Sequence, residues 1–296
     1  MTMRILFFAA VAIQATTSRC SATSQRPRAV TQTEVDSTFR EPQPVEIRGY
    51  NGDALEPFVT RDGQWLLFNS AGLPGADVDI HVARAIDSLN FEYVGRLTGA
   101  NSSASDITPS VDAQGTMYFV SMRDDRPGYT VHRARFARGT ASSPGMVPGM
   151  PQGPDIFVFD VEVSADGETL YCSNGIYRDR SWPDEADIFI ARRRGDSFVR
   201  DADSPRIFAA INTDDALEYG AAVSRDELEI FFTRQRGKET TIYHSTRASR
   251  SDPFGAPRRV GAITGFVEAP TLSPDGRAIY YHELEGRRYG LYRTVR

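Results

Sequence analysis

The sequence lacks most of the residue patterns that mark a known chemistry. It contains two cysteines in 296 residues, Cys20 and Cys172, and its four histidines stand far apart along the chain. No nucleophile elbow, glycine-rich phosphate loop or cysteine–histidine cluster with metal-site spacing occurs. A disulfide framework, a P-loop enzyme and a cysteine–histidine zinc site are therefore excluded. Cys172 lies among apolar residues and is expected to be a buried free thiol.

An excess of basic charge is also missing. The chain carries 34 lysines and arginines against 39 aspartates and glutamates, a formal net charge of -5, and the two signs are mixed along its length. Because no basic block is present that could neutralise a phosphate backbone, nucleic acid is not expected as a partner. With 40% hydrophobic residues, the chain can bury a large core.

Long hydrophobic runs are absent except near the N-terminus. Arg4 precedes the apolar run Ile5 to Ile13, which is too short to span a bilayer and has the layout of a secretory signal. We expect residues 1–22 to be a signal peptide, with cleavage near Ala15 or Ala22. An uncleaved leader is the alternative. The protein is expected to be exported, to the periplasm, the cell envelope or the medium.

Cys20, near the end of this leader, is a candidate site for a lipid anchor. The preceding residues Thr17, Ser18 and Arg19 depart from the aliphatic and small residues of a bacterial lipobox. Residues 23–43 are rich in polar residues and proline, a composition that predicts a disordered tether without a core. Residues 44–296 are predicted to form one domain.

What the sequence does contain is a repeated hairpin. Alternating apolar residues flank a tight turn in Thr271 to Tyr281, the pattern of two antiparallel strands. A third strand follows each such hairpin and a fourth follows most of them, for example Asp79 to Arg84 and Phe91 to Leu97. The turns recur every 49 to 60 residues, and each has a hydroxyl residue two positions before an aspartate: Thr60, Ser110, Ser164, Ser224 and Ser273.

Four short antiparallel strands in each period are typical of a propeller blade. We therefore predict an all-β fold, a single five-bladed β-propeller with four-stranded antiparallel blades. The fifth unit stops after its third strand. The segment Val45 to Arg48 matches the missing strand, and we expect it to pair with Tyr289 to Val295 and close the ring.

These units resemble a known repeat. The stretch Glu268 to Gly276, followed by Ile279, Tyr280 and Tyr281, is similar to the WD40-like repeat of TolB-type bacterial propellers. The resemblance covers Pro44 to Arg296 and implies a propeller in an exported bacterial protein, most often a scaffold or interaction module. TolB itself has a six-bladed propeller and a separate N-terminal domain, so a role in the Tol envelope system is not implied.

Five carboxylates stand at or near the start of the first strands. Because these strands begin beside the central channel, their side chains are expected to form an acidic ring around one mouth. The ring could bind a hard cation such as calcium, for which Asp106, Asp160 and Glu218 are the candidates. The five residues are Glu56, Asp106, Asp160, Glu218 and Glu268.

Two other roles for the ring stay open. It could catalyse acid–base cleavage of a glycosidic bond, as the resemblance of this outline to five-bladed furanosidase propellers implies. Alternatively, each acid accepts hydrogen bonds from its own strand entry or pairs with a neighbouring arginine. We favour this structural role because five equivalent positions do not provide one protonated and one ionised acid.

The longest loop at the same mouth, Ser173 to Ala186, offers candidate ligand-binding residues. Tyr177 and Trp182 alternate there with Arg178 and Arg180, and aromatic and arginine side chains supply much of the energy of interfaces. The alternative is a loop that folds onto its own blade.

Arginines occupy corresponding loops of the second and fourth units. Arg123 and Arg126, like Arg234 and Arg236, could bind an anionic ligand, although pairing with nearby acids is favoured. Three of the histidines occupy one position of the third strand in different units. Rotation about the ring therefore separates His81, His132 and His244, and they cannot share a metal.

From the sequence we predict a monomeric, non-enzymatic, exported binding module for a protein or glycan partner, without a cofactor. The alternative is a glycoside-active enzyme that uses the acidic mouth.

Overall fold

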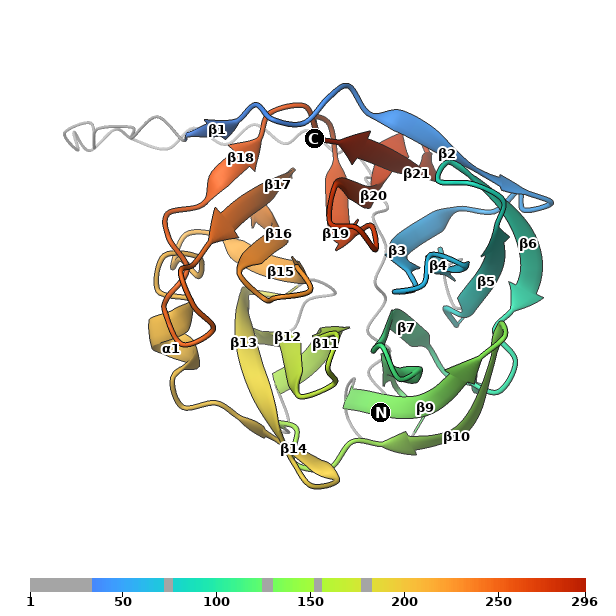
Figure 1. Cartoon of the computed structure of the whole chain (residues 1–296), viewed down its shortest axis with the longest axis horizontal. Coiled ribbons are helices and arrows are strands. Elements are labelled where there is room, and N and C mark those ends of the chain that lie inside the picture. Colours follow the sequence, from blue (N-terminus) through green and yellow to red (C-terminus); the bar gives the residue numbers. More distant parts are fainter. Residues whose placement is uncertain (1–33, 72–76, 124–129, 152–155, 177–182) are drawn as a thin grey trace, which may run out of the picture.

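The computed structural model describes residues 34–71, 77–123, 130–151, 156–176 and 183–296. These residues form β-sheets arranged around a central channel, as in a β-propeller (Figure 1). Within the described ranges there is one short helix, α1 (Ser204–Ile207), and no helix has the length and apolar character needed to cross a membrane. The prediction of an all-β propeller is confirmed at this level.

The sheets run outward from an innermost strand beside the channel (Figure 1). One four-stranded sheet contains β7 (Asp106–Val111), β8 (Thr116–Ser121), β9 (Thr130–Ala137) and β10 (Thr140–Met146). Another contains β11 (Ile156–Val163), β12 (Thr169–Ile176), β13 (Glu185–Arg194) and β14 (Ser197–Arg200). A third contains β15 (Leu217–Val223), β16 (Glu229–Arg236), β17 (Glu239–Thr246), β18 (Arg258–Val260) and β1 (Val35–Asp36).

The fourth sheet has eight strands because it joins the two ends of the domain. In spatial order it contains β19 (Val267–Leu272), β20 (Ala278–Glu285), β21 (Arg288–Val295), β2 (Gln43–Arg48), β6 (Asn90–Arg96), β5 (Ile80–Ala85), β4 (Trp65–Ser70) and β3 (Ala54–Val59).

Strand β2 closes the ring, as predicted, but in two halves. Its first half pairs antiparallel with β21, with Gln43 opposite Arg293 and Val45 opposite Leu291. Its second half, from Glu46 onward, turns to a parallel pairing with β6. The pairing with β6 was not predicted. It satisfies the backbone groups that β2 no longer shares with β21. One strand thus connects the last hairpin, β20 and β21, to the half of the eight-stranded sheet formed by β3, β4, β5 and β6, the first sheet along the chain.

The segment before β2, expected to belong to a tether, packs against the ring. β1 pairs in parallel with β18, with Val35 opposite Arg259. The Asp36 carboxylate lies 2.8 Å from His244 Nδ1, and the Phe39 ring is buried edge-on against Phe231. Polar composition was therefore a poor guide for residues 34–43, because the pairing of β1 and the buried side chains of Asp36 and Phe39 place this segment against the ring.

The cores lie between neighbouring sheets. Both faces of the middle strands are covered, so a strand such as β8 is buried along nearly its whole length. Val120 of β8 and Leu170 of β12, for example, belong to one apolar cluster with Phe189. Cys172 is in the same cluster as a buried free cysteine, as predicted.

Four of the five predicted turns share one arrangement. In each, the hydroxyl donates its proton to the aspartate at 2.6 Å and accepts a hydrogen bond from a backbone N–H after the turn. Ser273, for example, donates to Asp275 and accepts from the N–H of Ala278. The second repeat differs, because Asp112 accepts the N–H groups of Gln114 and Thr116 and so takes the place of the hydroxyl residue. Ser110 instead donates its hydroxyl proton to Glu162. The alignment of that repeat was therefore wrong by two residues.

Candidate functional site

The innermost strands carry irregularities that decide which side chains reach the channel. In four of them the pairing shifts by one residue at a position with a positive φ: Glu56 (50°), Thr108 (49°), Gly220 (62°) and Ala269 (51°). In β11 the shift lies between Val158 and Asp160. Positive φ is uncommon for residues other than glycine and indicates a constrained backbone. These residues, with Asp160, line a channel cavity.

The five predicted acids therefore do not form one ring of equivalent residues. Counted from these irregularities, Asp106 and Glu218 lie two residues earlier than Thr108 and Gly220, and Glu268 lies one residue before Ala269. The misaligned second repeat had hidden this offset for Asp106. The acids consequently divide into a pair locked by arginines and a group of three at the channel.

Asp106 and Glu218 make the same kind of contact in different sheets. Both are fully buried, and each lies 2.7 Å from a guanidinium, that of Arg123 and Arg234 respectively. Each also accepts a hydrogen bond from a loop N–H, at 2.6 Å from Ser102 and 3.1 Å from Thr213.

The two arginines in turn donate to loop carbonyls, Arg123 to Ala100 and Arg234 to Ile211. These contacts fit the structural role predicted for the acids and the ion pairing favoured for the arginines. Arg236 likewise pairs with Asp215. Of the residues described, no group of three or more histidine, cysteine, aspartate or glutamate side chains could hold a metal ion, and Asp106, Asp160 and Glu218 are not brought together as a cation site.

Glu56 and Asp160 face a channel cavity of about 30 Å³, which has room for about one or two water molecules. Burial raises the pKa of Glu56 to about 8, and the nearby carboxylates of Asp160 and Glu268 add to the shift. Burial also raises the pKa of Asp160 to about 7, helped by Glu162. Both side chains remain partly accessible from the channel. At neutral pH the Glu56 carboxyl therefore carries a proton at this mouth, whereas Asp160 titrates close to neutrality.

Glu268 is held by two neighbours in the same group. Tyr219 donates its hydroxyl proton toward one carboxylate oxygen, and His282 Nε2 lies 3.2 Å from the other. The opposite ring atom, His282 Nδ1, accepts a hydrogen bond of 3.1 Å from the backbone N–H of Glu56. In the neutral ring Nδ1 then has no proton and Nε2 donates to Glu268. His282 thus connects two of the three acids.

Sequence reasoning missed His282, the one histidine that does not occupy the repeated position of the third strand. A signal was present, because the last hairpin pairs β19 with β20 and places Glu268 directly opposite His282. The other histidines stay apart, as predicted. His81 contacts Tyr93 at 2.7 Å within its own sheet, and His244 contacts Asp36.

The far end of the cavity is closed by an ion pair. Arg61 follows β3 and reaches Glu162 of β11, with 2.8 Å between Nη2 and Oε1. Below this pair, on the face that carries the Asp-Gly turns, lies a separate hollow of about 670 Å³. The two ends of the channel are therefore chemically distinct.

The structure describes only the two ends of the predicted binding loop, Ser173 to Ala186. Tyr177, Arg178, Arg180 and Trp182 lie outside the described residues, as does Arg126.

Comparisons with known proteins support the fold only. No protein-family model matches the chain, and no curated protein matches it. Among solved structures, it is similar to a protein described as a glycoside hydrolase, with a TM-score of 0.62, 12% identity, and 88% of this chain and 92% of that one covered. It is also similar to a family-43 glycoside hydrolase from Xanthomonas citri, with a TM-score of 0.57, 16% identity and coverage of 85% and 90%.

A putative TolB from Agrobacterium tumefaciens matches with a TM-score of 0.49, 14% identity and coverage of 84% and 79%. That likeness is too slight to carry an argument, and the resemblance to TolB-type repeats is not confirmed as a family assignment. At these identities the two glycoside hydrolases show that this chain has a β-propeller fold.

Proposed function

We propose that the protein hydrolyses a glycosidic bond at the channel mouth formed by Glu56, Asp160 and Glu268. The observation that carries the proposal is the Glu56 carboxyl, which is partly accessible and whose pKa of about 8 keeps it protonated at neutral pH. Glycoside hydrolysis needs one carboxylic acid that protonates the leaving oxygen and one ionised carboxylate. Propellers of similar fold whose descriptions name glycoside hydrolase activity make this reaction class the natural one to test.

The three acids take different roles in this proposal. Glu56 donates the proton. Glu268 is the ionised partner, because the Tyr219 hydroxyl and the His282 N–H donate hydrogen bonds that favour a carboxylate. Asp160 is the neighbour whose charge helps to keep the Glu56 pKa high. This assignment supplies the difference between acids that five equivalent positions would lack.

The proposal also specifies the number of blades, the extent of the domain and the cellular location. Counting the eight-stranded sheet as two blades gives five blades, four of them four-stranded and one with β1 as a fifth strand, each with its innermost strand at the channel. The domain spans residues 44–296 together with the strap, the segment 34–42 that precedes β2. Export, to the periplasm, the envelope or the medium, would bring such a site to extracellular or envelope glycans, and Cys20 remains a candidate anchor.

The test is a substrate screen of the purified protein on arabinan, xylan and fructan, measured by release of reducing ends. Glu56→Gln and Glu268→Gln are expected to lower the rate by about a hundredfold or more. Glu283→Gln is the matched control, because Glu283 lies on β20 near this group but does not line the cavity. A rate that survives in both variants would refute the assignment, and no hydrolysis of any of these glycans would refute the activity for this substrate set.

A second candidate is the non-enzymatic binding module for a protein or glycan. It is favoured by the arginine locks on Asp106 and Glu218 and by the small volume between Glu56 and Asp160. Glycan binding that is retained in Glu56→Gln without any hydrolysis by the wild type would support this candidate over the enzyme.

A further inference from the structure

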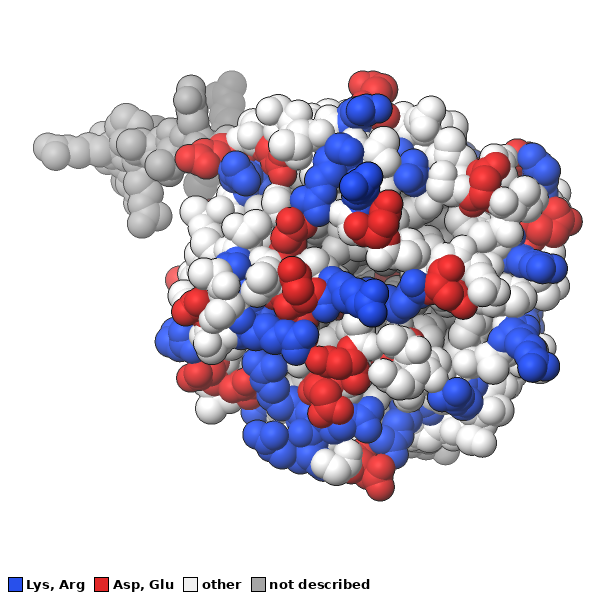
Figure 2. Space-filling model, in the orientation of Figure 1, with Lys and Arg blue, Asp and Glu red and all other residues white. Residues whose placement is uncertain are grey.

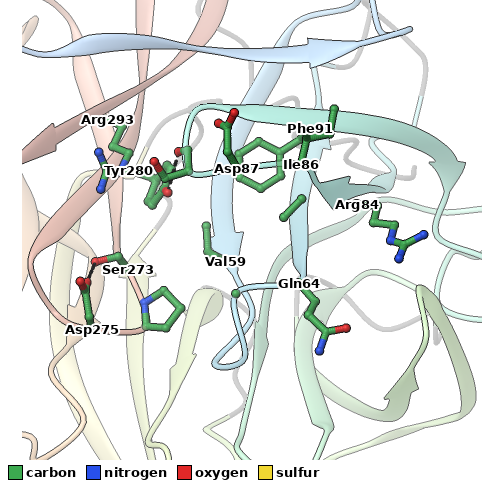
Figure 3. Close-up of a pocket in the computed structure, with 14 residues that line it drawn as sticks. Val59, Gln64, Arg84, Ile86, Asp87, Phe91, Ser273, Asp275, Tyr280 and Arg293 are labelled. Atoms are coloured by element: carbon green, nitrogen blue, oxygen red, sulfur yellow. Dashed lines mark hydrogen bonds between the residues drawn. The ribbon is translucent and has the colours of Figure 1, made fainter.

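A second pocket lies on the opposite face, at the seam where the last hairpin meets the first sheet. It has a volume of about 520 Å³, within the range of small-molecule sites. Val59, Ile86 and Phe91 come from the first sheet, and Tyr280 and Arg293 come from β20 and β21. Figure 3 shows Arg293 and Tyr280 on one side and Arg84 on the other, with Val59 and Ile86 between them.

The acids of this pocket are already occupied. The Asp87 carboxylate accepts hydrogen bonds from the backbone N–H groups of Leu89 and Asn90, at 2.8 and 2.9 Å. The Asp275 carboxylate accepts from the Ser273 hydroxyl at 2.6 Å and from the Arg277 N–H at 3.1 Å. Both side chains thus serve the turns that contain them, and neither neutralises a cation across the pocket.

The two arginines of this pocket, Arg84 and Arg293, are not paired with acids among the residues that the structure describes. Within the described ranges, no ion pair joins Arg84 or Arg293 to a carboxylate, and the Nε atom of Arg293 is buried without any hydrogen-bond acceptor. Arg293 lies 5.6 Å from the centre of the Tyr280 ring, which keeps its guanidinium beside the pocket. A guanidinium that lines a concave site and has no paired carboxylate is a position where an anion is favoured.

The floor between the arginines is apolar. Ile86 is 51% exposed, one of the few large hydrophobic side chains on the surface, and Pro274, Val59 and Phe91 continue the lining beside it. A highly charged ligand such as a polyphosphate would leave this floor uncovered. A ligand with one carboxylate and an apolar body matches both parts of the lining.

We propose that the seam pocket binds a small monocarboxylate, with its carboxylate at Arg293 and its apolar body over Ile86, Val59 and Pro274. The ligand contacts both sheets that meet there. These sheets are also joined by the hydrogen bond of 2.8 Å from the Tyr280 hydroxyl to the Ser88 carbonyl. Binding therefore stabilises the closed ring as well as filling the pocket. The proposal is independent of any activity at the channel mouth.

The probe is 4-phenylbutyrate, with the neutral 4-phenylbutanamide as its matched partner, titrated into the full chain by calorimetry up to about 1 mM. The acid is expected to bind the wild type. The amide should bind the wild type about tenfold or more weakly than the acid does, and the acid should bind Arg293→Gln about tenfold or more weakly than it binds the wild type. The acid should also raise the melting temperature of the wild type.

A second pair of variants separates pocket effects from folding defects. Ile86→Asp places a negative charge on the exposed floor and is expected to abolish binding of the acid. Val94→Asp is the matched control, because Val94 is 57% exposed on β6 and does not line the pocket, and it should bind as the wild type does. Equal binding of acid and amide, unchanged binding in Ile86→Asp, or no binding of the acid by the wild type would overturn the proposal.

Discussion

Arg61 and Glu162 form an ion pair across the channel between two sheets that are separated by the β7 sheet. The Arg61 Nη2 atom lies 2.8 Å from Glu162 Oε1 and 2.7 Å from the carbonyl oxygen of Val163. The second carboxylate oxygen accepts the Ser110 hydroxyl proton at 2.6 Å. The pair closes one end of the channel and connects parts of the ring that no backbone pairing joins. Figure 2 shows basic and acidic side chains close together around the centre of the ring.

Removing Arg61 should destabilise the protein strongly. Arg61→Met leaves the buried Glu162 carboxylate without its cation, and we expect a loss of about 3 kcal/mol in the free energy of unfolding, measured by urea denaturation. Arg48→Met is the control, because Arg48 pairs with Glu46 on the exposed surface and should cost about 0.5 kcal/mol or less. Similar losses in both variants would contradict a structural role for the channel pair.

The Asp106–Arg123 contact gives a second test of the same kind. Arg123→Met leaves Asp106, which has no exposed area, as an unpaired buried acid, with an expected loss of about 3 kcal/mol. Adding Asp106→Asn to that variant should restore part of the loss, because the uncompensated charge is gone. A double-mutant cycle in urea measures this coupling. If Asp106 instead belonged to a catalytic group, Arg123→Met would alter glycan hydrolysis with little effect on stability.

The repeat explains why so much of the fold was predictable. The turn at Ser273 to Gly276 has local chemistry that recurs, so the hairpins and the closing strand could be placed from the sequence. Local chemistry also explains where the alignment of the repeats failed. Asp112 can accept the same N–H groups as a serine, and this substitution moved the second repeat out of alignment. The error then made Asp106 look equivalent to Glu56.

The candidate site was less predictable because it depends on backbone irregularities. Glu56 reaches the channel through a positive φ that its sequence does not indicate, since glutamate rarely adopts it. The raised pKa of Glu56 arises from burial and from two acids on other strands, Asp160 on β11 and Glu268 on β19, and is a property of the assembled ring. The strap was missed for a related reason, because Asp36 contacts His244, a residue far away in the sequence.

The strap before β2 should contribute to stability in an acid-sensitive way. Burial raises the pKa of Asp36, but hydrogen bonds from Thr38 and His244 outweigh it, and the net pKa is below the usual 3.8. A carboxyl with a lowered folded pKa stabilises the protein above its unfolded pKa, and the contribution is lost as pH falls through the folded value. Asp36→Asn should therefore lower the melting temperature at pH 7 and have less effect near pH 2.

Truncation separates the strap from the closing strand. Removal of residues 1–42 deletes β1 and Phe39, whereas removal of residues 1–49 also deletes β2 and its pairing with β21 and β6. We expect a moderate fall in melting temperature for the first deletion and a much larger fall for the second. Equal effects, or no effect of the longer deletion, would show that β2 does not close the ring.

The channel acids predict the opposite dependence on pH. The pKa of Glu56 is raised from 4.5 to about 8 and that of Asp160 from 3.8 to about 7, so between these limits the folded state binds more protons than the unfolded state. The free energy of unfolding should therefore fall as pH rises from about 4 to about 8 and then level off. Glu56→Gln keeps the shape of the protonated acid but cannot ionise. It should flatten this slope and make the variant more stable than the wild type at pH 8, by about 1 kcal/mol or more.

Glu283→Gln is the comparison for urea denaturation across this pH range, because Glu283 lies on β20 and does not line the cavity. Partial burial and Glu285 also raise the pKa of Glu283, so this variant should flatten the slope in the same direction but less than Glu56→Gln does. If Glu56→Gln instead destabilised the protein at pH 8, the carboxylate would be the form that the fold prefers, and Glu56 could not supply the proton for hydrolysis. Gained stability together with lost hydrolysis in one variant is the result expected of an acid that the fold maintains for its chemistry at a cost in stability.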